Sequence, residues 1–183
     1  FLRVMHLAGG GYLLIGPERF EDVHVSRSRD NELWFLADRP GARPHRVGQK
    51  MAEGAAVSKQ STKIAFAVGH GQDPAIAAGR TQIVVAELDV AGPAPALRNA
   101  RVAVSSDGPA CSLEAQDFYD DDRRLTYTCY EPEGRASVWT ADLATGERVN
   151  QSASIGAYNE VEGIFPGGRD TCVESDHQAR EYG

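Results

Sequence analysis

The feature that most constrains the fold of this chain is an internal repeat, and residues 113–149 are its clearest copy. Two apolar segments, 113–118 and 124–130, flank a short polar turn, as expected for a β-hairpin. β-Branched and aromatic residues then alternate with small polar residues through 136–141 before a second turn at 142–146. This copy predicts a four-stranded antiparallel meander, which is the size of one propeller blade.

Other segments repeat the same pattern of an apolar residue, a turn, a basic or polar pair and an apolar strand. The segments that match are 57–66, 118–127 and 164–173, and their third strands match at 33–36, 83–86 and 138–141. This alignment makes Trp34 and Trp139 equivalent. The first copy is the least regular, because it turns through three consecutive glycines at 9–11. The second-strand landmarks are taken as Leu13, Ile64, Leu125 and Thr171.

A repeat period of roughly 40 to 50 residues is typical of β-propellers. We therefore predict an all-β fold, a partial β-propeller of four-stranded antiparallel blades with about three and a half blades present. The whole chain, 1–183, forms one incomplete domain, with blades at approximately 1–50, 51–105, 111–152 and 157–183, the last of them partial. Such a set leaves sheet edges open, so we expect self-association or missing blades supplied by additional chain. Because the sequence starts at Phe1 without a leader, we expect a processed, trimmed or partial product.

Charge and hydropathy exclude some classes of partner. The net charge of -7 argues against a nucleic-acid or anionic-membrane surface. No apolar run approaches the ~20 residues that cross a bilayer. The three cysteines are too few for a zinc cluster or a disulfide scaffold. Two readings stay open: a single Cys111–Cys129 bridge with Cys172 left over, or three half-buried free cysteines, and we favour the second.

The repeat unit, followed by a strand that ends in Asp-Leu-x-Thr-Gly, resembles the WD40-like (PD40) repeat of TolB-like β-propellers. The best matches are 118–127 with 138–146, and 164–173, where Pro166 keeps the family's proline. The segments 59–61 and 120–122 depart from the family's Pro-Asp-Gly turn. The resemblance implies a propeller that serves as a binding scaffold, a gate on a peptidase or the framework of a sugar lyase.

The innermost strand of each propeller blade lines a central channel. Glu53, Glu114 and Glu160 each stand four residues before the apolar landmark of a predicted innermost strand. A ring of carboxylates at the channel mouth would attract cations or a basic peptide. Glu162, with Gln116 as its counterpart, adds to this polar channel. The simpler interpretation, which we favour, is that these carboxylates are solvated strand ends or caps of nearby amides.

Loops between second and third strands lie on one face of a closed propeller, and three histidines fall in them. The predicted metal ligands are His24, His70, His177 and Gln178, with Asp73 or Asp176 as further oxygen ligands. Such a divalent metal site resembles that of oligogalacturonate lyases. Loop histidines are usually only solvated, so a resident cofactor is not our first expectation.

Trp34 and Trp139 could stack on a sugar or a peptide, but equivalent aromatics in repeated strands more often pack between blades, and we favour packing. The run 120–122 is interpreted as a hairpin turn rather than a calcium loop. Our leading hypothesis is a non-catalytic binding scaffold, periplasmic or extracellular, for a protein or saccharide partner. The alternatives are a metal-assisted polysaccharide lyase of the oligogalacturonate type and the propeller portion of a serine peptidase.

Overall fold

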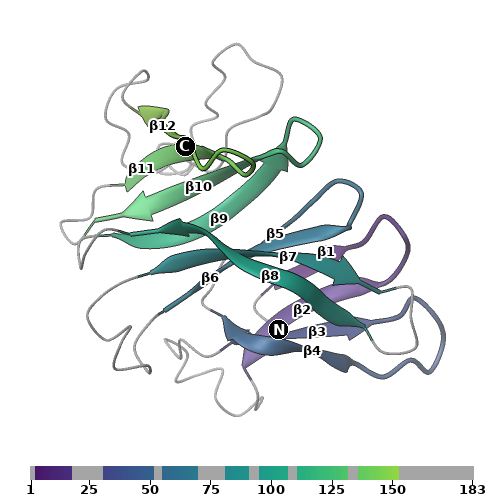
Figure 1. The fold of residues 1–183 in the computed structure, drawn as a ribbon. Coiled ribbons are helices and arrows are strands. Elements are labelled where there is room, and N and C mark those ends of the chain that lie inside the picture. The colour runs from purple at the N-terminus through teal and green to yellow at the C-terminus, as the bar shows by residue number, and fades with distance from the viewer. Residues whose placement is uncertain are drawn as a thin grey trace, which may run out of the picture.

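The computed structural model describes residues 3–17, 31–51, 55–69, 81–90, 95–106, 111–131 and 136–152. These residues form three four-stranded antiparallel sheets, each made of consecutive strands (Figure 1). The all-β fold of propeller-type blades is therefore confirmed. Sheet A contains β1 (Arg3–His6), β2 (Tyr12–Pro17), β3 (Asn31–Leu36) and β4 (His45–Met51). Sheet B contains β5 (Ala55–Val57), β6 (Lys63–Val68), β7 (Gln82–Asp89) and β8 (Ala96–Ser105). Sheet C contains β9 (Ser112–Tyr119), β10 (Arg124–Tyr130), β11 (Ala136–Asp142) and β12 (Arg148–Asn150).

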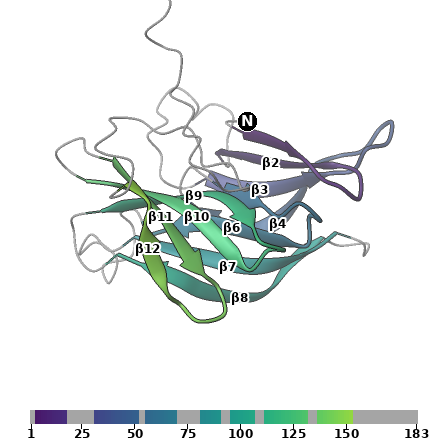
Figure 2. The same cartoon turned by 90° about the horizontal axis from the view of Figure 1, so that it is seen from above.

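The three sheets stack in chain order, with sheet B in the middle (Figure 1). Seen from above, sheet C lies over sheet B (Figure 2). Side chains alternate between the two faces of a strand, so neighbours in β6 pack in opposite directions. Ile64 and Phe66 face sheet A, whereas Ala65 faces sheet C. Both faces of sheet B are covered, and the segments 64–68 of β6 and 83–86 of β7 are accordingly apolar at every position.

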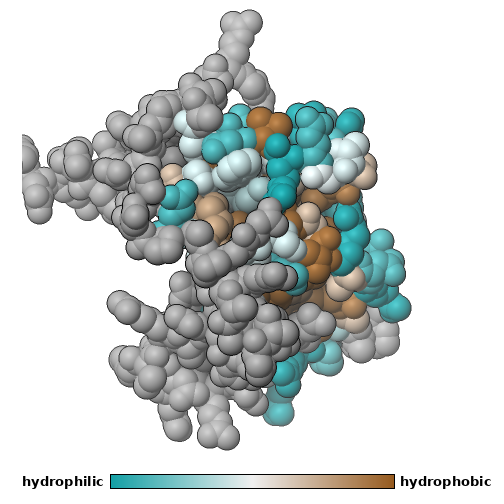
Figure 3. Space-filling model, turned by 60° about the vertical axis from the view of Figure 1, so that its left-hand side comes forward, coloured by the Kyte–Doolittle hydropathy of each residue, from teal (hydrophilic) through white to brown (hydrophobic). Residues whose placement is uncertain are grey.

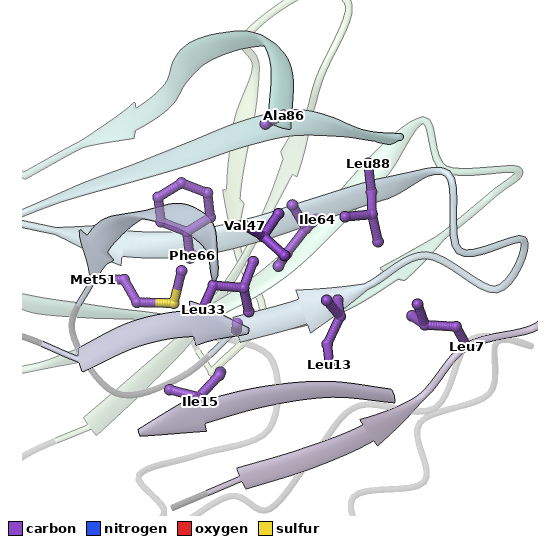
Figure 4. Close-up of a cluster of buried hydrophobic side chains, with 11 residues drawn as sticks. Leu7, Leu13, Ile15, Leu33, Val47, Met51, Ile64, Phe66, Ala86 and Leu88 are labelled. Atoms are coloured by element: carbon purple, nitrogen blue, oxygen red, sulfur yellow. The ribbon is translucent and has the colours of Figure 1, made fainter. Parts of the chain in front are cut away.

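Two apolar cores hold the stack together, one on each face of sheet B. Core 1 joins sheets A and B (Figure 4), and core 2 joins sheets B and C. Core 1 contains Leu7, Leu13, Ile15, Leu33, Val47, Met51, Ala55, Ile64, Phe66, Ala86 and Leu88. Core 2 contains Ala56, Ala65, Ile83, Val85, Val104, Leu113, Ala115, Phe118, Leu125, Tyr127 and Ala141.

Strand pairing confirms the predicted alignment of the second and third repeats. Ile64 pairs with Ala86 in sheet B, and Leu125 pairs with Ala141 in sheet C. The turns agree as well, because Ser61 and Asp122, which the alignment makes equivalent, both have left-handed backbones with φ of 56° and 60°.

The landmark chosen for the first repeat was wrong by one residue. Leu13 packs in core 1 against the face of sheet B that carries Ile64, so the two residues point in opposite directions along the stack. Trp34 pairs with Leu14 as Trp139 pairs with Tyr127, which makes Tyr12 the counterpart of Ile64. The glycines of the first turn carry no side chains that would mark the register in the sequence.

Along one side of the stack, the first hairpin of each sheet contacts the first hairpin of the next sheet. The Ala8 amide of the β1–β2 hairpin donates to Ser61 Oγ of the β5–β6 hairpin at 2.8 Å. Lys63 Nζ at the start of β6 donates to the Asp122 carbonyl of the β9–β10 hairpin at 3.2 Å. Among the residues described, no helix has the length and hydropathy of a membrane-spanning segment.

Candidate functional site

Of the four predicted channel-mouth carboxylates, Glu114 is the one that the structure describes. It lies in β9 and pairs with Thr128 of β10. The register of β9 and β10 shifts at Gln116, so this residue is the extra residue of a β-bulge, and its Nε2 donates to Thr128 Oγ1 at 3.2 Å. The bulge lies between Glu114 and the landmark Phe118. In a strand without a bulge, a carboxylate four residues before the landmark would therefore not occupy the position that Glu114 has here. Glu53, Glu160 and Glu162 lie outside the described residues, and the ring of carboxylates stays a prediction.

The predicted metal ligands also lie outside the described residues. This applies to His24, His70, His177 and Gln178, and to Asp73 and Asp176. Within the described ranges, histidine, cysteine, aspartate and glutamate form no group of three that could hold a metal ion. The metal site therefore stays a prediction.

The structure shows a concave site that the sequence did not indicate, here called the inter-sheet pocket. It lies between the end of β8 and the face of sheet C that packs on sheet B, and has a volume of about 510 Å³. Propeller blades radiate outward, so the space between neighbouring sheets widens towards their outer strands. Larger side chains are needed to fill it there. The lining residues are Val104, Ser105, Ser106, Cys111, Leu113, Tyr127, Cys129, Glu131, Ser137, Trp139, Arg148 and Asn150.

Two paired aromatic residues form one wall of the pocket. Tyr127 of β10 and Trp139 of β11 are direct neighbours across the sheet. The Trp139 indole Nε1–H donates to Ser137 Oγ at 2.9 Å, and the ring packs against core 2, as expected for an aromatic between blades. Burial raises the pKa of the Tyr127 phenol, and nearby Arg148 partly offsets this rise, so the phenol is neutral at physiological pH.

The rim of the pocket is polar, and part of it joins the two sheets. Arg148 Nη1 of β12 donates to the backbone carbonyl of Ser105 in β8 at 3.1 Å. Ser106 Oγ accepts from the Thr81 amide at 2.9 Å, which fixes the end of β8 beside the start of β7. Among the described lining residues, the ionisable side chains besides Tyr127 are those of Arg148 and Glu131, and their formal charges sum to zero.

A disulfide between Cys111 and Cys129 forms a further part of the lining. Cys129 pairs with Leu113, which lies two residues after Cys111 in the sequence. The Cα atoms of Cys111 and Cys129 are 5.4 Å apart, within the usual range for a disulfide. The favoured interpretation of three free cysteines is therefore wrong for these two. Cys172 lies outside the described residues.

The other predicted aromatic, Trp34, occupies the equivalent position in sheet A but lines no comparable site among those described. It is half-buried in β3, and its indole nitrogen is buried without a hydrogen-bond partner among the residues that the structure describes. The two tryptophans therefore share a register position and differ in their surroundings.

Comparison with known proteins supports the fold. No protein-family model matches the sequence, and no curated protein matches it. Among solved structures, the chain is similar to a protein assigned as TolB from Agrobacterium tumefaciens, with a TM-score of 0.51 and 12% sequence identity. The similarity covers 80% of this chain and 44% of that structure, so the chain spans less than half of its length. A TolB-like propeller fold is thus supported, whereas membership of the PD40 repeat family is not confirmed.

Proposed function

We propose that this chain is a non-catalytic, propeller-type binding scaffold that recognises a protein or saccharide partner through the inter-sheet pocket. The observation that carries the proposal is the chemistry of the pocket. Apolar and aromatic walls combined with a few convergent polar groups are typical of ligand sites. Here Trp139 and Tyr127 supply the aromatic surface, and Ser137 and Asn150 supply polar groups.

The walls of the pocket are held in place before any ligand arrives. The Cys111–Cys129 disulfide fixes the residue before β9 to β10, and Arg148 connects β12 to β8. Preorganisation of this kind reduces the entropy that is lost on binding. The disulfide also supports an oxidising compartment, so we place the protein in the periplasm or outside the cell.

The size of the pocket limits how a partner can use it. About 510 Å³ suits a small ligand or one inserted group, whereas a folded partner covers roughly 800 Å² of each surface. A saccharide would therefore occupy the pocket itself. A protein partner would insert one side chain and bind the neighbouring surface with the rest of its interface.

The proposal can be tested with ¹⁵N-labelled chain and two panels of defined probes, short peptides and disaccharides. We expect members of at least one panel to shift the indole N–H signal of Trp139 and the amide signals of Ser105 and Ser137. The indole signal of Trp34 serves as an internal control, because Trp34 lies on sheet A, away from the pocket.

A variant that fills the pocket separates this site from other surfaces. Asn150→Phe places a ring in the pocket, because Asn150 pairs with Trp139 on the same face of sheet C, whereas Ala144→Phe places the same ring on an exposed turn. Binding should be lost in the first variant and retained in the second. Saturating shifts that persist in Asn150→Phe, or no shift with either panel, would refute the proposal.

A further inference from the structure

We infer that the inter-sheet pocket takes a neutral saccharide, with Trp139 as the surface on which a sugar ring stacks. This inference rests on the proposed function, because it assigns a ligand class to the same pocket. It combines three observations: the aromatic wall, the hydroxyl and amide lining, and the charge of the pocket and of the whole chain.

The aromatic wall gives a sugar ring an apolar surface. One face of a pyranose ring presents mainly C–H groups, and these pack against the flat face of an aromatic side chain. Trp139 is half-buried, so part of its ring remains open to the pocket. Its indole N–H is already bonded to Ser137, which fixes the orientation of the ring.

The polar part of the lining matches the hydroxyl groups of a sugar. A sugar hydroxyl donates one hydrogen bond and accepts others, so it pairs best with groups that do both. Ser137 and Asn150, which lie on the same face of sheet C as Trp139, carry hydroxyl or amide groups of this kind. Both lie beside the aromatic wall, since Ser137 accepts from the Trp139 indole N–H and Asn150 pairs with Trp139 across β11 and β12, and an amphipathic ring needs polar groups next to an apolar surface.

The charges favour a neutral ligand over an acidic one. The lining residues that the structure describes include one guanidinium, on Arg148, and one carboxylate, on Glu131, so they offer no excess of positive charge. Arg148 also donates to the backbone of Ser105. The chain as a whole carries a net charge of -7, which repels anions at long range.

The geometry favours a saccharide over an extended peptide. Peptides commonly bind as an added strand along a free sheet edge, where backbone hydrogen bonds supply the affinity. Here part of the wall is the face of β10 and β11, and the two edge strands that complete it, β8 and β12, are joined by the Arg148 side chain. A compact ring fits such a site better than an extended backbone.

The test is a titration of the ¹⁵N-labelled chain with maltose, cellobiose and lactose, followed at the Trp139 indole signal and at the Ser137 amide signal, the second of which is also present in variants without the indole. We expect saturable shifts with at least one of these disaccharides. Methyl glucoside and methyl glucuronide form a matched neutral and acidic pair, and the neutral compound should bind more tightly. Short peptides should leave the signal unchanged.

Two variants at position 139 separate stacking from folding. Trp139→Leu keeps an apolar side chain but loses the flat ring, and we expect it to weaken saccharide binding about tenfold. Trp139→Phe keeps a ring and should lose less affinity. Trp34→Phe should bind as the wild type does. A native-like spectrum for each variant shows that the fold is retained, and Trp139→Phe keeps the test decisive if Trp139→Leu fails to fold.

The outcomes distinguish this inference from the proposed function. Peptides that shift the pocket signals while saccharides do not would refute the saccharide and leave the binding scaffold standing. Tighter binding of the glucuronide, or unchanged affinity in both Trp139 variants, would also refute the inference. If no saccharide and no peptide shifts the pocket signals, both the inference and the proposed function are refuted.

Discussion

At the scale of single residues, the three-glycine turn of sheet A gives a graded test of backbone geometry. Gly10 and Gly11 have φ of 89° and 90°, where a side chain is strained, whereas Gly9 has open space around it. A Cβ on Gly11 would also lie 2.8 Å from Phe35 Cε2 and 2.9 Å from the Leu36 carbonyl oxygen. We expect Gly11→Ala to lower the free energy of unfolding by about 3 kcal/mol, and Gly10→Ala by about 1 kcal/mol.

The series contains its own control. Gly9→Ala should leave the free energy of unfolding within about 0.5 kcal/mol of the wild type, because the added methyl group meets no neighbour. Urea unfolding of the four proteins, followed by circular dichroism, gives the order. Equal stability of the Gly9 and Gly11 variants would contradict the geometry of this turn.

Asp142 stabilises the second turn of sheet C, and we expect it to make the free energy of unfolding depend on pH in the acidic range. Its Oδ1 accepts from the amides of Ala144 and Thr145 at 2.9 and 3.0 Å, and its Oδ2 pairs with Arg123 at 3.0 Å. The amide hydrogen bonds, and then Arg123, lower the pKa of this carboxyl from 3.8 to about 2. Its stabilising contribution is therefore complete above pH ~4 and is lost as pH falls towards 2.

We expect Asp142→Asn to lose stability at neutral pH and to lose less further stability between pH 5 and pH 2 than the wild type. Thermal unfolding across this range measures the effect. Asp38→Asn, which removes the same charge from an exposed site, controls for the change in net charge. An unchanged pH profile in the Asp142 variant would show that another carboxylate dominates.

At the scale of elements, the disulfide and the β9–β10 hairpin support each other. The bridge closes a loop between residues 18 apart in sequence. Loop-closure arguments give about 2–3 kcal/mol for a bridge of this span. We expect the double variant Cys111→Ala, Cys129→Ala to lose that amount, measured by urea unfolding.

The reductant provides the matched control for the disulfide. A reducing agent should destabilise the wild type to the level of the double variant and should leave the variant unchanged. A wild type whose unfolding midpoint does not respond to reduction would show that the strand pairing alone fixes the hairpin.

Sheets B and C could be aligned from the sequence because apolar residues flank each of their turns. The register of sheet A could not, because residues 9–11 present no side chains to count from. The bulge at Gln116 was equally hidden, since an extra residue in a strand changes the pairing and not the composition.

The pocket was missed because it depends on the spacing between two sheets, which no repeat pattern encodes. The one signal in the sequence was a tryptophan, Trp139, where the preceding repeat has Val84.

At the scale of the whole molecule, the two end sheets expose apolar side chains on the faces that point away from sheet B. Val4 of sheet A is 60% exposed, and Tyr130 and Val149 of sheet C are 43% and 47% exposed. Strand pairing places Val4 on the face opposite core 1 and the other two on the face opposite core 2. Apolar and hydrophilic side chains also lie side by side on the face shown in Figure 3.

These side chains predict concentration-dependent self-association. We expect the double variant Val4→Lys, Tyr130→Lys to shift the population towards monomer, as measured by sedimentation velocity over a range of concentrations. Val102→Lys is the matched control, because Val102 is 48% exposed but lies on the outer strand of sheet B. Val102→Lys is compared with Val4→Lys alone, so that each variant adds one charge. Equal effects of these two substitutions would show that general surface charge, and not the end faces, controls association.

The equivalence of Val84 and Trp139 has a consequence for how such a protein can diversify. Both residues occupy the same register position of a third strand, yet the first packs against core 1 and the second lines a pocket. A substitution at this position changes the space between two sheets without changing which strands pair. Over evolutionary time, successive repeats can therefore acquire separate specificities through one variable side chain each, while the alternating strand pattern maintains the shared architecture.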